Sequence, residues 1–109
     1  LHHALKRLSA LPPNTRVYCT HEYTEANLRF ALSCESDNPD IQQRHSDTIA
    51  LRATGQPSLP SSIALENATN PFLRCHISEI ILRVESHAGH ALPDELAVFT
   101  ELRVWRNTF

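Results

Sequence analysis

The sequence lacks several features that mark common classes of protein. It has no methionine among its 109 residues, and it begins with leucine. It contains no run of about 18 apolar residues, so no membrane-spanning helix is expected. Its formal net charge of −2 predicts no bulk attraction to nucleic acid or to an anionic membrane. The first residues are amphipathic and include Lys6 and Arg7, unlike a secretory signal. These absences leave one modest globular domain as the expectation.

The three cysteines, Cys19, Cys34 and Cys75, are an odd number without a regular spacing. This pattern argues against a disulfide framework and against a C-x-x-C zinc knuckle, and it favours a reducing, cytoplasmic location. A Cys/His site is one hypothesis for Cys19, because it lies two residues before His21. Strand alternation instead places Cys19 on an inward-facing position, which favours core packing.

The first 33 residues predict a helix, a short strand, a loop and a second helix. Apolar residues recur at helical spacing over Leu1–Leu11, which predicts a helix with one buried stripe that ends at Pro12. The β-rich stretch Thr15–Thr20 predicts a strand, and His21 follows at its carboxyl end. In α/β folds, metal ligands and substrate contacts lie at this edge of a sheet. Thr24 can then cap the next helix.

Three further helices are predicted from the signals at their ends. Asn38 as N-cap and Pro39 at the first helical position open a helix that ends at Gly55. A second helix has a clean stripe of isoleucine and valine and ends at Gly89. A last helix begins near Asp94, directly after a proline. Most of the chain beyond residue 24 is therefore expected to be helical.

The last helix contains two arginines whose position leaves two interpretations open. We expect Leu96, Phe99 and Leu102 to form its buried stripe, and at about 100° per residue Arg103 and Arg106 leave from the same side. In one interpretation both side chains extend along apolar surface and favour the negative end of the helix dipole. In the other they line a groove and bind the carboxylates of an anionic ligand through their planar donor forks.

Four stretches of the sequence match one family in the same order. They are L-P-P-N-T-R-V-Y-C-T-H-E-Y-T-E-A-N-L-R-F-A (Leu11–Ala31), L-P-S-S-I-A-L-E (Leu59–Glu66), N-P-F-L-R (Asn70–Arg74), and the closing helix with its two arginines. Together they resemble glyoxalase II, the hydroxyacylglutathione hydrolases, whose first stretch usually reads C-G-H-E-Y-T. Thr20 stands where glycine is usual, so this position tolerates a Cβ atom.

The resemblance implies an α/β fragment with two parts. Members of the family join a metallo-β-lactamase αββα sandwich, which holds two metals, to a helical domain that helps to bind glutathione. Residues 1–24 would be the last helix-strand unit of that sandwich, and residues 25–109 the helical glutathione-binding domain. The family signature T-H-x-H-x-D-H is absent from this sequence. We therefore expect a C-terminal part of a longer protein, inactive by itself, in which Phe72 and Leu73 pack the helices onto a missing sheet.

The resemblance also implies the roles of four residues. His21 would bind one of two divalent metal ions, with zinc expected and iron or manganese as alternatives. A zinc site needs at least three protein ligands, so His21 cannot hold the metal alone, and no other catalytic residue is expected in this chain. Tyr23 would contact the glutathione backbone, and Arg103 and Arg106 its glycine carboxylate. Without the resemblance, His21 is more typical of a hydrogen-bonded structural residue and Tyr23 of an interfacial aromatic.

For the intact protein, the resemblance implies hydrolysis of S-lactoylglutathione and other S-2-hydroxyacylglutathiones. A metal-activated hydroxide would yield glutathione and D-lactate, the second step of methylglyoxal detoxification. The expected partner is this small thioester, with no nucleic acid and no membrane, and the protein is expected to be a cytoplasmic monomer. Two alternatives are another glutathione-dependent enzyme of the metallo-β-lactamase fold, such as a persulfide dioxygenase, and a non-catalytic helical binding module.

Overall fold

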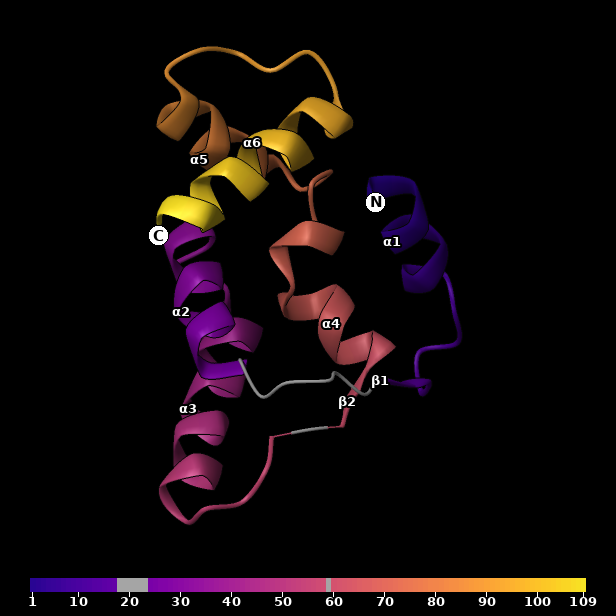
Figure 1. The fold of residues 1–109 in the computed structure, drawn as a ribbon, viewed down its shortest axis with the longest axis vertical. Coiled ribbons are helices and arrows are strands. Elements are labelled where there is room, and N and C mark those ends of the chain that lie inside the picture. Colours follow the sequence, from indigo (N-terminus) through magenta and orange to yellow (C-terminus); the bar gives the residue numbers. More distant parts are fainter. Residues whose placement is uncertain (18–23, 59) are drawn as a thin grey trace.

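The computed structural model describes residues 1–17, 24–58 and 60–109. Over these ranges the chain is mostly helical and has one two-stranded sheet (Figure 1). The elements follow the chain in this order: α1 (His2–Ser9), β1 (Arg16–Val17), α2 (Thr24–Cys34), α3 (Pro39–Ala53), β2 (Ser61–Ser62), α4 (Ile63–Thr69), the 3₁₀ helix η1 (Pro71–Leu73), α5 (Ser78–Ala88) and α6 (Glu95–Thr108). None of the described helices is both long enough and apolar enough to cross a membrane.

The end signals of three helices act as the sequence predicts. The Asn38 side chain accepts a hydrogen bond from the backbone N–H of Asp40 at 2.9 Å and so caps α3. Gly89 follows α5 with φ of 84°, in the left-handed region that favours glycine. Asp94 caps α6 by accepting from the N–H of Ala97 at 2.8 Å. The predicted start of α3, end of α5 and start of α6 are therefore confirmed.

The sheet consists of β1 and β2, which run antiparallel. Arg16 pairs with Ser62 and Val17 with Ser61. The predicted strand Thr15–Thr20 is thus present at its start, and its remainder lies outside the described residues. The pairing brings the segment before α2 against the segment before α4.

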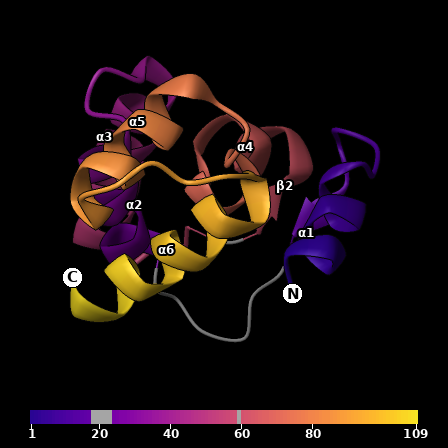
Figure 2. The ribbon, with the colours of Figure 1, turned by 90° about the horizontal axis from the view of Figure 1, so that it is seen from above.

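The core joins α2, α5 and α6. Phe30 of α2 is 1% exposed, and its ring centroid lies 5.2 Å from that of Trp105 and 6.2 Å from that of Phe72. Figure 2 shows α6 running across the molecule from the side of α1 to the side of α2. A smaller apolar cluster joins α2 to α3. The buried members of the larger cluster are Phe30, Cys34, Cys75, Ile80, Val84, Val98, Phe99 and Leu102, and those of the smaller are Leu28, Ala31 and Ile41.

Helix α1 corrects one expectation. It was expected to bury an apolar stripe, yet it contains no buried residue, and Leu1 and Leu8 are 69% and 51% exposed. Only Leu5 packs against the larger cluster. The reason is that α1 lies at the edge of the described structure (Figure 1), where it contacts α4, η1 and the start of α6 and leaves its other side uncovered. The periodicity predicted the helix correctly but not the neighbour that would cover its stripe.

The described fold is compatible with the expected α/β fragment followed by a helical domain. Helices α2, α5 and α6 pack around the larger cluster, α3 packs on α2 through the smaller one, and the two-stranded sheet lies beside the start of α4 (Figure 1). The division at residue 24 and the metallo-β-lactamase sandwich stay predictions.

Candidate anion-binding site at the end of α6

Helix α6 has a different buried face from the one its sequence suggested. Val98, Phe99 and Leu102 are at most 3% exposed, whereas Leu96, expected in the stripe, is 57% exposed. Because Val98, and not Leu96, belongs to the buried face, the centre of that face points away from Arg103. Arg103 is accordingly exposed, and Arg106 is half-buried. Of the two arginines expected on the buried side, only Arg106 lies there.

Arg106 is held against α2 by two contacts. Its Nη2 donates a hydrogen bond to Oδ1 of Asn27 at 3.2 Å. Its Cζ lies 5.9 Å from the centroid of the Phe30 ring, within the range of a cation–π interaction. A guanidinium has five N–H donors, so these contacts leave most of the fork available for a ligand. Because Asn27 is near the start of α2, Arg106 lies close to the point where this helix begins.

The Phe30 ring beside Arg106 is buried and packs against two other aromatic rings. The Phe30 ring meets Trp105 of α6 and Phe109, the residue after α6, edge-to-face, at centroid distances of 5.2 and 5.3 Å and interplanar angles of 75° and 70°. Such pairs contribute about 0.5–1.5 kcal/mol each beyond their buried area. The position of Arg106 relative to α2 is therefore fixed by the core and not by the arginine alone.

Arg103 lies one helical turn before Arg106. Its side chain makes no hydrogen bond or ion pair with any other residue that the structure describes. The two cations thus differ: one is oriented by its neighbours, and the other extends into solvent. An arginine pair at three-residue spacing is suited to bind a carboxylate or another planar anion.

His21 and Tyr23, the other two expected site residues, lie outside the described residues. In the sequence Tyr23 directly precedes Thr24, the first residue of α2, and His21 lies two positions before Tyr23. Cys19 and Thr20 also lie outside the described residues.

The residues that the structure describes do not by themselves form a metal centre. Over residues 1–17, 24–58 and 60–109, no group of three His, Cys, Asp or Glu side chains is placed to hold a metal ion. Burial raises the pKa of the Cys34 and Cys75 thiols to about 12, so both are protonated near neutral pH and are poor ligands and nucleophiles. A metal bound through His21 would need its other ligands from outside these ranges.

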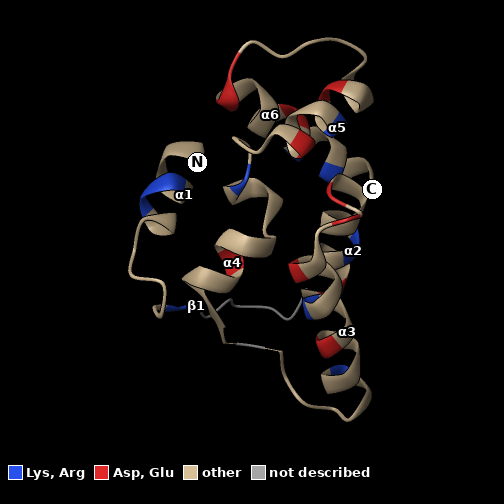
Figure 3. Cartoon of the chain, turned by 180° about the vertical axis from the view of Figure 1, so that it is seen from behind, with Lys and Arg blue, Asp and Glu red and all other residues tan. Residues whose placement is uncertain are grey.

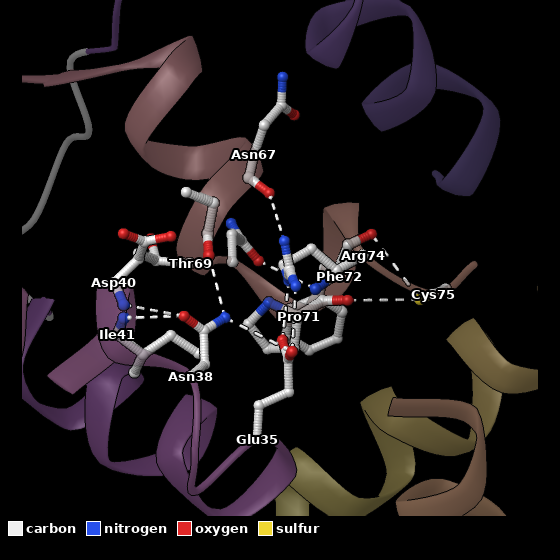
Figure 4. A network of polar contacts seen from close by, with 12 residues as sticks. Glu35, Asn38, Asp40, Ile41, Asn67, Thr69, Pro71, Phe72, Arg74 and Cys75 are labelled. Carbon is white, nitrogen blue, oxygen red and sulfur yellow. Dashed lines mark hydrogen bonds and ion pairs between the residues drawn. The ribbon is translucent and has the colours of Figure 1, made fainter. Parts of the chain in front are cut away.

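A buried ion pair, which the sequence did not reveal, lies between the end of α2 and η1 (Figure 4). Arg74 donates from Nε and Nη2 to the two carboxylate oxygens of Glu35, at 2.7 and 3.0 Å, and from Nη1 to the backbone oxygen of Asn67 at 3.0 Å. Asn38 adds hydrogen bonds to Glu35 at 3.4 Å and to the backbone oxygen of Ala68 at 3.3 Å. The Glu35–Arg74 network ties the end of α2 to the start of α3, the end of α4 and η1.

A second arginine, Arg44, makes hydrogen bonds between α3 and the neighbouring β2 and α4. Arg44 donates to Thr69 Oγ1 at 2.8 Å, to Ser61 Oγ at 3.2 Å and to Glu66 Oε1 at 3.3 Å. Asn70 donates to the other oxygen of Glu66 at 3.3 Å. These contacts join α3 to β2 and α4 and give Ser61 a structural role.

The N-P-F-L-R stretch forms the 3₁₀ helix η1, whose first turn is capped by Asn70 through the N–H of Phe72 at 3.0 Å. The expectation that Phe72 and Leu73 pack onto a sheet outside this chain stays a prediction, but Phe72 also packs within the chain. Its ring centroid lies 6.2 Å from that of Phe30 and 5.7 Å from that of Phe99, so it faces the helical core of this chain.

The start of α6 is anchored to α1 by Glu95. His2 Nε2 and Lys6 Nζ lie 3.2 and 3.1 Å from the two carboxylate oxygens of Glu95, and we call these three residues the Glu95 clasp. Figure 3 shows basic α1 and the acidic start of α6 on the same side of the molecule. Burial alone would raise the pKa of Glu95, but the hydrogen bonds from Lys6 and His2 outweigh it and lower the pKa. α6 is therefore anchored at both ends.

Comparison with known proteins assigns the chain to a family. The family model described as "Hydroxyacylglutathione hydrolase C-terminus" matches residues 22–109, and the chain belongs to this family. Three similar proteins all bear the name hydroxyacylglutathione hydrolase. The one from Methylobacillus flagellatus is 53% identical over 109 residues, which are 100% of this chain and 42% of that protein.

Two further relatives come from Pseudomonas. The Pseudomonas putida KT2440 protein is 50% identical over 106 residues, 97% of this chain and 41% of its own length. The Pseudomonas aeruginosa protein is 46% identical over 109 residues, 100% of this chain and 42% of its own length. The chain thus spans about two fifths of the length of these relatives.

Proposed function

We propose that this chain is the C-terminal, substrate-binding part of an enzyme that hydrolyses glutathione thioesters. The substrate is S-lactoylglutathione or a related 2-hydroxyacyl thioester, and the products are glutathione and the hydroxy acid. The family match and the names of the relatives support this proposal. The observation that carries it in the structure is Arg106, which is oriented beside the start of α2 with most of its donors unused.

The arginines bind the glutathione part of the substrate in this proposal. The glutathione moiety has carboxylates remote from the thioester, and a guanidinium fork matches a carboxylate in geometry and charge. Arg106 supplies the fixed contact and Arg103 the adjustable one. Tyr23, which directly precedes α2 in the sequence, contacts the glutathione backbone in this proposal, as the family resemblance implies. These contacts with the glutathione part hold the thioester in place for the reaction.

His21 is proposed as one ligand of a metal centre, zinc or alternatively iron or manganese. Its remaining ligands belong to the part of the relatives that this chain does not cover. Such a centre, when bound, supplies hydroxide near neutral pH and polarises the thioester carbonyl. This chain contributes one metal ligand and the residues that bind the glutathione part of the substrate.

The test is an assay of the longer protein proposed to contain this chain. We expect it to hydrolyse S-lactoylglutathione, followed as loss of thioester absorbance, whereas the 109-residue chain alone shows no turnover. The comparison substrate is the lactoyl thioester of N-acetylcysteamine, which has no carboxylates. Loss of a charge-assisted contact should lower kcat/KM for it at least about tenfold.

Two results would overturn the proposal. Equal kcat/KM for both thioesters would remove the carboxylate-binding role of the arginines. Oxygen uptake with glutathione persulfide, together with no thioester hydrolysis, would replace the hydrolase by a persulfide dioxygenase.

A further inference from the structure

The contact between Asn27 and Arg106 has no role in forming α2. Asn27 is exposed, and asparagine is a weaker helix former than alanine at an exposed position. Its only side-chain hydrogen bond within the described residues is the one that Oδ1 accepts from Nη2 of Arg106 at 3.2 Å. The bond links helices that are 79 positions apart in the sequence. Its physical effect is on the orientation of the guanidinium.

Two contacts restrict Arg106 in different directions. The Phe30 ring lies 5.9 Å from Cζ and supports the guanidinium from one side. Asn27 fixes the rotation of the fork by engaging one nitrogen. Arginine side chains lose rotamer entropy when they are ordered, so a fork that is already oriented loses less when an anion binds.

We propose that Asn27 is a positioning residue that pre-orients Arg106 for the carboxylate of the substrate, an inference that rests on the proposed function. Asn27 acts through Arg106 and does not itself need to touch the ligand. Arg103, which has no such neighbour among the described residues, cannot replace this oriented contact. The effect of Asn27 should therefore depend on the presence of Arg106.

The experiment is a double-mutant cycle in the longer protein with S-lactoylglutathione as substrate. Asn27→Ala should raise KM about three- to tenfold, the value of one net hydrogen bond, with kcat within about twofold of wild type. In the Arg106→Ala background the same substitution should leave KM unchanged. The matched control is Asn107→Ala, which removes an exposed asparagine beside Arg106 and should leave KM unchanged.

A second readout separates positioning from a general structural effect. The substrate is S-lactoylglutathione with its glycine carboxylate converted to the amide. Asn27→Ala should no longer raise KM for this substrate, because the group that the oriented fork binds has lost its charge. A merely structural role would raise KM for both substrates alike.

The outcomes distinguish the two proposals. If Arg106→Ala raises KM but Asn27→Ala does not, the positioning role is wrong and the proposed function stands. If Asn27→Ala raises KM equally with and without Arg106, the residue does not act through Arg106, and the inference is also wrong. If Arg106→Ala leaves KM unchanged, carboxylate binding by this arginine fails, and the positioning role fails with it.

Discussion

The buried ion pair between α2 and η1 and the exposed end of α6 use arginine in opposite ways. Arg74 engages three nitrogens with Glu35 and Asn67, and the Glu35 side chain is only 3% exposed. Arg106 engages one nitrogen, and Arg103 none with any described residue. The contrast shows that the number of satisfied donors separates a structural arginine from one available to a ligand. The position of an arginine along a helix does not separate these two kinds of arginine.

The largest expected effect comes from breaking the Glu35–Arg74 network. Arg74→Ala leaves a buried carboxylate without its partner and should lower the free energy of unfolding by about 3–5 kcal/mol. Urea denaturation followed by circular dichroism measures the change. The control is the double variant Glu35→Leu, Arg74→Met, which removes both charges and should recover much of the loss. A loss below about 1 kcal/mol for Arg74→Ala, the range of a surface pair, would show that the network is not structural.

A smaller effect is expected from the turn that leads from α5 towards α6. Gly89 has φ of 84°, and a Cβ atom added there would meet no atom within 4 Å. Gly89→Ala therefore adds strain without a clash and should cost about 1–2 kcal/mol of stability while leaving the α6 arginines in place. Gly55→Ala, with φ of 75° and equally open space, is the matched control at the end of α3. Calorimetric melting temperatures that rise for Gly89→Ala would contradict the left-handed turn.

The His45 side chain tests whether a buried polar group lowers stability when it has no hydrogen-bond partner. Its Nε2 is the one buried side-chain nitrogen or oxygen, within the described part of the chain, that has no hydrogen-bond partner. Replacing it by an apolar side chain removes this unmet demand, so His45→Leu should raise stability by about 1 kcal/mol. His76→Leu, at an exposed position, should change it by less than about 0.5 kcal/mol. Destabilisation by His45→Leu in the same denaturation assay would indicate an unrecognised partner.

The smallest effect concerns the Glu95 clasp, which lies nearer the surface than the Glu35–Arg74 network. The folded-state pKa of Glu95 is lowered, so its stabilising contribution is present above the ordinary value of about 4.5 and is lost as pH falls through the lower folded value. Glu95→Gln should remove this contribution and flatten the fall in stability below about pH 4.5. Unfolding midpoints between pH 3 and 6 measure it. A wild type and variant with identical pH profiles would show that the clasp does not hold α6.

Local signals predicted the helices well, and contacts distant in sequence were not predictable. Asn38, Gly89 and Asp94 act within a few residues of their own position, so the boundaries that they set were confirmed. Helix α4 was not assigned from the sequence. It is only seven residues long and is capped by Ser62 just after a proline-containing loop.

The candidate site was predicted only in part, for the same reason. Glu35 and Arg74 are 39 positions apart, and no periodicity indicates that they pair. The face of α6 was misplaced because Leu96 fits the helical spacing as well as Val98 does, and only the neighbouring helices decide which is covered. The role of Arg106 came from the family resemblance, and its contact with Asn27 needed the fold.

The most direct test of the contrast between the two regions is a paired measurement on Arg106→Ala in the longer protein. We expect KM for S-lactoylglutathione to rise about 10- to 100-fold, the value of a charge-assisted hydrogen bond, while the melting temperature stays within a few degrees of wild type. The Arg52→Ala control, on the exposed last turn of α3, removes one exposed hydrogen bond to the backbone oxygen of Gln56 and should leave KM unchanged and the melting temperature within a few degrees of wild type. An unchanged KM, or a melting temperature that falls as far as that of Arg74→Ala, would place Arg106 with the structural arginines and contradict the account.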